Sequence, residues 1–204
     1  MLARAPARWR AATDWYSPRV ACESASGPVI RRATRDDLAN LVRVAREAFF
    51  ATYSTIDDPL DVAAYAERNF TTEAFGAVLD DLSAHLAVLL DAGGMAGYAL
   101  LVRSPAPGCV VAGRAVELSR LYLLPDRIGR GHGAALLRHA LDWAAESGFD
   151  TLWLGVYDRN ERAMAFYRRF GFEVVGTRPF DWHGEIYHDP VMARAVKLPR
   201  LANG

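Results

Sequence analysis

The feature that most limits how this chain can fold is a turn with three glycines between a strand pattern and a helix pattern. The glycines stand at positions 129, 131 and 133, directly after an apolar, strand-like segment at 115–124. Apolar residues then recur at the spacing of one helix face, up to a natural C-cap near Gly148. That face carries Leu136, Leu137, Ala140, Leu141 and Ala144. A strand that turns into an amphipathic helix is typical of folds that combine sheet and helix, because the helix packs its apolar face onto the sheet.

Patterns on either side of this turn predict the remaining elements. The N-terminal part predicts a strand at 29–32, a helix after Thr34, a second helix at 59–69, a third after Thr72, and antiparallel strands at 85–91 and 97–103. The C-terminal part predicts a strand at 151–157, a helix at 161–170 and two strands around 183–184. The expected fold class is α/β, in the form of an α+β mixed sheet of about seven strands with helices on both faces.

Composition favours one globular domain preceded by a tail. The chain has 204 residues, of which 51% are hydrophobic, which is enough to fill a substantial core. Residues 1–27 show neither a helical nor a strand period and predict a flexible N-terminal tail. Residues 28–204 are therefore expected to form a single domain.

The charge balance argues against several kinds of partner. Lys plus Arg and Asp plus Glu each number 24, so the formal net charge is zero. Proteins that bind nucleic acid or anionic membranes carry a basic excess, so neither partner is expected. The apolar runs are far shorter than the roughly 20 residues that cross a bilayer. The two cysteines, Cys22 and Cys109, lack the spacing of a metal site or redox pair, which predicts reduced thiols, a cytoplasmic location and no metal.

The glycine turn is a candidate anion site. Backbone N–H groups in a first helical turn lack partners, the helix dipole favours negative charge there, and glycine lets a phosphate approach the main chain. The glycine spacing differs from the dinucleotide fingerprint, and the Gly-Lys-Ser/Thr of a phosphate-binding loop is absent from the sequence. A different diphosphate ligand is therefore indicated, and the alternative is a tight turn with a structural role alone.

This turn resembles the acetyl-CoA loop of the GNAT superfamily of N-acetyltransferases, which reads Gln/Arg-x-x-Gly-x-Gly/Ala. Gly131 and Gly133 occupy its two small positions, whereas Ile128 stands where the family has Gln or Arg. The resemblance implies that amides of the turn hold the CoA pyrophosphate and that the preceding strand pairs with the pantetheine arm. The amides belong to Ile128, Gly129, Arg130, Gly131, His132 and Gly133, and the strand residues are Leu121, Tyr122 and Leu123.

A second segment, at 160–172, matches the same superfamily. In the family this segment is the helix that flanks the cofactor arm. Asn160 matches the asparagine that hydrogen-bonds the arm, and Tyr167 matches the tyrosine that faces the thioester sulfur. The resemblance covers residues 28–198. It implies an enzyme that moves an acetyl group from acetyl-CoA, its co-substrate, directly to a primary amine within a ternary complex.

Acetyl transfer needs an acid for the departing thiolate and a base for the amine. Tyr167 is the candidate acid, because a phenol of pKa about 10 stays protonated at neutral pH. Glu117 is the candidate base, since superfamily members carry a glutamate at this spacing before the turn. The alternative for Glu117 is a structural ion pair with Arg120 or another arginine. The N–H of Leu123 is the candidate donor to the thioester carbonyl.

The acceptor amine is the least constrained part of the function. Residues 57–81 hold seven acidic residues and one arginine, which either attract a cationic acceptor or form solvated helix faces. Residues 153–160 and 189–192 resemble the PaiA-type branch of the superfamily, whose members include polyamine acetyltransferases. This resemblance implies a small-molecule amine such as a polyamine. A protein or peptide amine and a non-catalytic acyl-CoA sensor are the alternatives, and a homodimer stays open because family members often dimerise.

Overall fold

The computed structural model describes residues 27–182 and 184–196, in which one mixed sheet of seven strands has the order β1-β2-β3-β4-β5-β7-β6. The strands are β1 Val29–Arg32, β2 Ala84–Asp91, β3 Gly94–Val102, β4 Ala115–Leu123, β5 Thr151–Gly155, β6 Glu173–Trp182 and β7 Glu185–Ala195. Neighbouring strands are antiparallel except β4 and β5, which are parallel. The expected mixed sheet is confirmed. The predicted tail at 1–27 lies outside the described residues, apart from Gly27.

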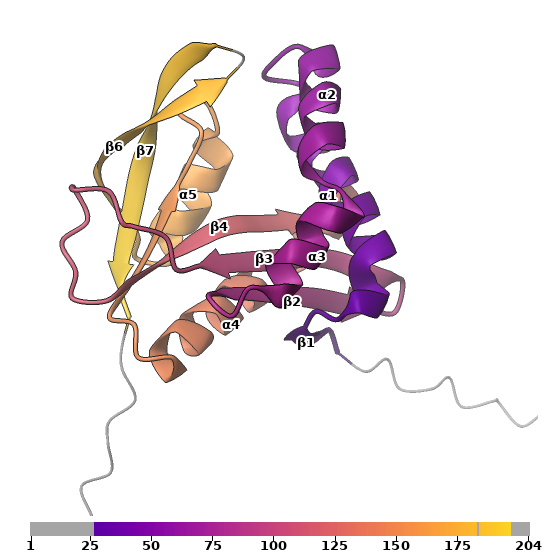
Figure 1. The fold of residues 1–204 in the computed structure, drawn as a ribbon, viewed down its shortest axis with the longest axis horizontal. Coiled ribbons are helices and arrows are strands. Elements are labelled where there is room, and N and C mark those ends of the chain that lie inside the picture. Colours follow the sequence, from indigo (N-terminus) through magenta and orange to yellow (C-terminus); the bar gives the residue numbers. More distant parts are fainter. Residues whose placement is uncertain (1–26, 183, 197–204) are drawn as a thin grey trace, which may run out of the picture.

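Helices cover both faces of this sheet, as expected (Figure 1). They are α1 Leu38–Tyr53, α2 Pro59–Asn69, α3 Thr72–Asp80, α4 His132–Glu146 and α5 Glu161–Arg169, with short 3-10 helices η1 Arg35–Asp37 and η2 Pro125–Arg127. Thr34 begins the first helical segment through a reciprocal capping box with Asp37. No helix within the described ranges is both long enough and apolar enough to cross a membrane.

Two hydrophobic cores lie on opposite faces of the sheet. The core under α1, α2 and α3 contains Leu41, Phe75 and Tyr98. The core under α4 and α5 contains Leu136 and Leu152. Successive strand residues point to opposite faces, so β3 and β4 contribute to both cores.

The sheet opens between its two parallel strands. β4 and β5 pair only from Ala115–Glu117 to Thr151–Trp153. Beyond Glu117, β4 continues to Leu123 alongside β3, with a register shift that leaves Ser119 as an extra residue. An extra residue bends a strand and increases its twist. β5 ends at Gly155, two residues before the predicted end, and pairs with β7 on its other side. The edge of β4 that faces β5 is therefore unpaired by any described strand over residues 118–123.

Candidate functional site

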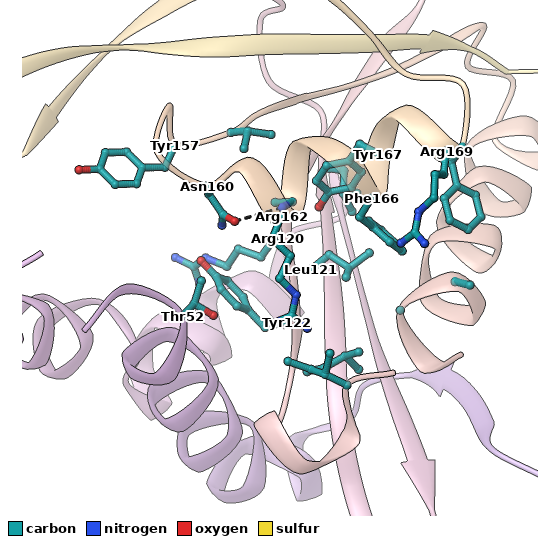
Figure 2. A pocket seen from close by; sticks show the side chains of 18 of the residues that line it. Thr52, Arg120, Leu121, Tyr122, Tyr157, Asn160, Arg162, Phe166, Tyr167 and Arg169 are labelled. Carbon is teal, nitrogen blue, oxygen red and sulfur yellow. Dashed lines mark hydrogen bonds between the residues drawn. The ribbon is translucent and has the colours of Figure 1, made fainter. Parts of the chain in front are cut away.

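A cavity of about 750 Å³ lies where β4 and β5 separate (Figure 2). Its walls come from four places: the unpaired end of β4, the glycine turn, α5 with the loop before it, and the C-terminal end of α1. Nine of the predicted site residues line it, namely Leu121, Tyr122, Leu123, Ile128, Gly129, Gly131, Gly133, Asn160 and Tyr167. The two sequence motifs, which are separated by helix α4, thus meet at one cavity.

The glycine turn has the backbone geometry of an anion cradle. Gly129 and Gly131 have φ values of 85° and 84°, a left-handed conformation that favours glycine. The N–H of Ala135 donates to the carbonyl of Gly131 at 3.0 Å. The N–H groups of residues 132–134 lie in the first turn of α4 and so have no carbonyl partner within the helix. A Cβ at Gly133 would lie 3.5 Å from Leu123, in ordinary contact, so this position is open towards the cavity. A phosphate group fits such a cradle.

The side chains of the turn point to a different part of the molecule. His132 is buried, with Nε2 3.4 Å from Oδ2 of Asp91 at the end of β2. Arg127 Nη1 lies 3.3 Å from the same oxygen. The guanidinium of Arg127 packs against Gly93, at the place that a Cβ would occupy. Arg130 is exposed, and neither Arg130 nor His132 lines the cavity. The role predicted for these two residues therefore remains that of their backbone amides.

Helix α5 positions Asn160 and Tyr167 along the cavity. Asn160 is the N-cap, and its Oδ1 accepts the N–H of Ala163 at 3.1 Å. Tyr167 is 9% exposed, and it projects with Phe166 from α5 towards Leu121 (Figure 2). Burial raises the pKa of Tyr167 well above its usual value. Its phenol thus stays protonated at neutral pH.

Glu117, the predicted base, does not line the cavity. Its Oε2 accepts a hydrogen bond from Ser104 Oγ at 2.6 Å, and its Oε1 accepts one from Arg178 Nη1 at 2.9 Å. Arg120 instead stacks over the ring of Phe70, at 4.8 Å. The carboxylate thus forms an ion pair with an arginine other than Arg120, as the structural alternative for this residue expects.

Two tyrosines that were not predicted as site residues form the rest of the cavity wall beyond β5. Tyr53, at the end of α1, lines the cavity with Tyr157, and their ring centroids are 5.9 Å apart. Tyr157 donates to Oδ1 of Asp57 at 2.9 Å. Asp57 belongs to the acidic stretch at 57–81, whereas Asp80 of that stretch pairs with Arg35. The aromatic character of these residues was visible in the sequence, but no local pattern placed Tyr53 beside Tyr157.

The described residues offer positive charge to an anionic ligand and no metal site. Arg120, Arg138, Arg162 and Arg169 line the cavity. Within residues 27–182 and 184–196, no group of three or more His, Cys, Asp or Glu side chains is arranged to hold a metal ion. The glycine cradle, the unpaired strand edge and the four arginines together fit an elongated ligand that carries phosphate at one end.

Known proteins are similar to this chain in sequence. The family model described as "Acetyltransferase (GNAT) family" matches residues 39–172. An "uncharacterized N-acetyltransferase" of Mycobacterium tuberculosis is 35% identical over 160 residues, which are 78% of this chain and 98% of the relative. A "thialysine N-epsilon-acetyltransferase" of Bos taurus is 29% identical over 161 residues, or 76% of this chain and 89% of the relative.

A solved structure is similar over the same region. The PaiA N-acetyltransferase of Thermoplasma acidophilum, in complex with coenzyme A, has a TM-score of 0.68 and 23% identity, and the alignment covers 83% of this chain and 99% of that one. At this identity the likeness concerns the fold. Together with the family match, these findings show that the chain belongs to the GNAT family and is an acetyl-CoA-dependent N-acetyltransferase.

Proposed function

We propose that this enzyme transfers the acetyl group directly to the primary amine of a small cationic acceptor, such as a polyamine, with Tyr167 as the acid. The observation that carries this proposal is the position of Tyr167, whose buried phenol lines the cavity between α5 and the unpaired edge of β4. A polar hydroxyl held among apolar groups at such an edge suits transfer of a proton to a group bound along the strand.

The donor-binding residues follow from the cavity walls. The amides at 128–133 would hold the pyrophosphate, and the peptide groups of Leu121 to Leu123 would pair with the pantetheine arm. Asn160 would contact the arm from the cavity wall, where its Oδ1 caps helix α5 and its side chain also hydrogen-bonds the phenol of Tyr53. When bound, acetyl-CoA supplies the acetyl group as a thioester. An N–H of β4, that of Leu123 in our assignment, would donate to the thioester carbonyl.

Tyr167 holds its proton at the phenolic oxygen because burial disfavours the phenolate. In the proposed reaction the C–N bond forms and the C–S bond breaks, and the departing sulfur receives the proton of Tyr167. The proton that the nitrogen loses as the amide forms passes through water and restores the phenol. Both carboxylate oxygens of Glu117 already accept hydrogen bonds from side chains, those of Ser104 and Arg178. We therefore give Glu117 a positioning role, in which it holds Arg178, and look for the base among other carboxylates.

Ring contacts on the acceptor side favour a small amine over an extended peptide. Tyr157 contacts Tyr53 of α1 and Tyr187 of β7, each at 5.9 Å between centroids. Tyr65 of α2 contacts Trp182 of β6 at 5.1 Å. These contacts join the helical wall to the β6–β7 hairpin and narrow the space between them. The name of the Bos taurus relative, an acetyltransferase of thialysine, adds support for a small acceptor.

The test is an acetylation assay on an amine panel. Purified protein would be mixed with acetyl-CoA and, separately, spermidine, lysine, thialysine and a peptide with a free N-terminus, while thiol release is followed. We expect turnover with at least one small cationic amine and a lower kcat/KM with the peptide. Faster acetylation of the peptide would favour the protein-directed alternative. Tight CoA binding in calorimetry with no turnover on any amine would favour the sensor and contradict the proposal.

A further inference from the structure

A buried carboxylate without a full set of partners lies next to the proposed acceptor side. Asp189 of β7 is 5% exposed, and its Oδ1 has no hydrogen-bond partner among the described residues. Burial raises the pKa of Asp189 to about 6, the charge of Arg178 acts to lower it, and the charge of Asp158 acts to raise it. An unsatisfied buried acceptor costs stability, so its presence calls for an explanation.

Its surroundings connect Asp189 to the cavity. The next residue, Pro190, accepts the N–H of Val156 at 2.9 Å, and Val156 lines the cavity. The main chain of Asp158 donates a hydrogen bond to the Asp189 side chain, and the charge of Asp189 acts on the cavity residue Tyr53. Asp189 is not itself a lining residue, but it lies beside the segment after β5 that forms part of the cavity wall.

The nearest cation is turned towards another carboxylate. Arg178 is paired with Asp189 across β6 and β7, a position from which the two side chains would ordinarily meet. Instead, Arg178 donates to Glu117 at 2.9 Å. A Cβ at Gly155 would lie 2.4 Å from Nε of Arg178, so the guanidinium crosses β5 where glycine leaves room. Glu117 is thus neutralised by direct contact and Asp189 is not.

Aromatic rings surround the same end of the site. Tyr187, two residues before Asp189 on β7, contacts Tyr157, and Tyr157 contacts Tyr53. Ring faces and a carboxylate together attract an ammonium group, through cation–π attraction and through charge. The titratable and charged groups that act on Asp189 are Arg178 from β6 and Asp158 from the loop after β5, and Tyr53 lies across from it on α1.

We propose that Asp189 receives the ammonium group of the acceptor and takes its proton before acetyl transfer. This inference rests on the proposed function. The proton moves from the ammonium nitrogen to a carboxylate oxygen, which leaves a neutral amine with a free electron pair and a protonated Asp189. The proton then passes to water and restores the carboxylate. Glu117, held by Arg178 and Ser104, keeps the arginine away from Asp189.

The decisive comparison is Asp189→Asn with Asp158→Asn, which makes the same chemical change at an exposed neighbour. We expect Asp189→Asn to lower kcat/KM for the preferred amine of the panel by about 100-fold or more. Wild-type kcat/KM should fall below about pH 6, because Asp189 must be ionised to accept the proton. This loss of activity at low pH should be absent in Asp189→Asn and persist in Asp158→Asn.

Two further readouts separate the proposal from a structural role. Spermidine binding to the CoA-loaded protein, measured by calorimetry, should weaken in Asp189→Asn by about 10-fold or more, with unchanged CoA affinity. The melting temperature should stay equal or rise, since the variant removes a buried charge. A lower melting temperature with intact amine binding, or a loss of activity below about pH 6 that persists in Asp189→Asn, would overturn the assignment. If wild-type protein binds CoA but neither binds nor acetylates any amine, the proposed function itself fails.

Discussion

Arg178 on β6 donates from Nη1 to Oε1 of Glu117 on β4 at 2.9 Å, although β5 and β7 lie between these strands in the sheet. The guanidinium crosses Gly155 and lies 5.6 Å over the ring of Trp153. The interaction thus ties the β6–β7 hairpin to the central strands at the point where the sheet opens.

Replacing Arg178 by Gln is expected to reduce the free energy of unfolding by about 2 kcal/mol, because Glu117 is left buried without its charged partner. Urea unfolding measures this change. Arg43→Gln is the control, since Arg43 and Glu47 form an exposed pair whose loss should cost less than about 0.5 kcal/mol. If both variants lost the same free energy of unfolding, the Arg178–Glu117 contact would stabilise the protein no more than an exposed ion pair does.

Replacing Tyr167 by Phe is expected to lower kcat by about 100-fold while the Kd for CoA stays the same, because the change removes a proton and leaves the ring. Steady-state kinetics and calorimetry provide the two measurements. Tyr98→Phe removes a phenol that does not line the cavity and should retain full activity. A kcat for Tyr167→Phe equal to that of Tyr98→Phe would exclude Tyr167 as the acid.

Replacing Gly131 by Ala is expected to weaken CoA binding by about 10-fold or more, since the left-handed turn would shift its amides away from the phosphate. Calorimetry with CoA tests this directly. Gly184→Ala is the matched control, because Gly184 has a similar φ of 87° but lies in the β6–β7 turn. Both variants should lose about 1 kcal/mol of stability. If both lost CoA affinity equally, the effect would come from strain alone.

His85 predicts a pH dependence of stability on the other side of the sheet. It lies 3.1 Å from His139 between ring nitrogens and stacks on Trp143 at 4.6 Å. Burial, together with the charges of His139 and Arg32, lowers the pKa of His85 from 6.5 to about 4. The unfolded chain therefore binds more protons between these pH values, and this contribution to stability is lost as the pH falls from about 6.5 to 4.

The corresponding variant is His85→Phe, which cannot titrate. Its stability relative to wild type should rise steadily as the pH is lowered through this range, as measured by urea unfolding at several pH values. A constant difference between His85→Phe and wild type across this range would show that the pKa of His85 is not lowered in the folded protein.

Local signals explain why most elements were predictable. α2 begins and ends where predicted because Asp58 caps it, accepting the N–H of Leu60 at 2.7 Å, and Pro59 occupies the first turn. β5 was predicted two residues too long. Val156 and Tyr157 continue its apolar pattern, but they serve the cavity wall and not the strand.

The site was predictable where it depends on the main chain and unpredictable where it depends on distant side chains. The spacing of the glycines alone indicates the turn, because the left-handed φ values of Gly129 and Gly131 favour glycine. The direction in which the His132 side chain points depends on Asp91, which lies in the β2–β3 hairpin. Arg178 and Glu117 form a hydrogen bond although they are 61 residues apart in the sequence, and Tyr157 and Asp57 do so at a separation of 100 residues. Such contacts come from strand order and helix packing, which no short pattern encodes.

The unpaired edge of β4 has a consequence for how this enzyme can change during evolution. Peptide groups are the same in every residue, so a ligand that pairs with a strand edge tolerates substitution along that strand as long as the strand persists. The opposite wall includes individual side chains, among them Tyr53 of α1 and Tyr157 of the loop after β5. Mutations in this wall can therefore change which amine is accepted, while the binding of acetyl-CoA along β4 stays the same.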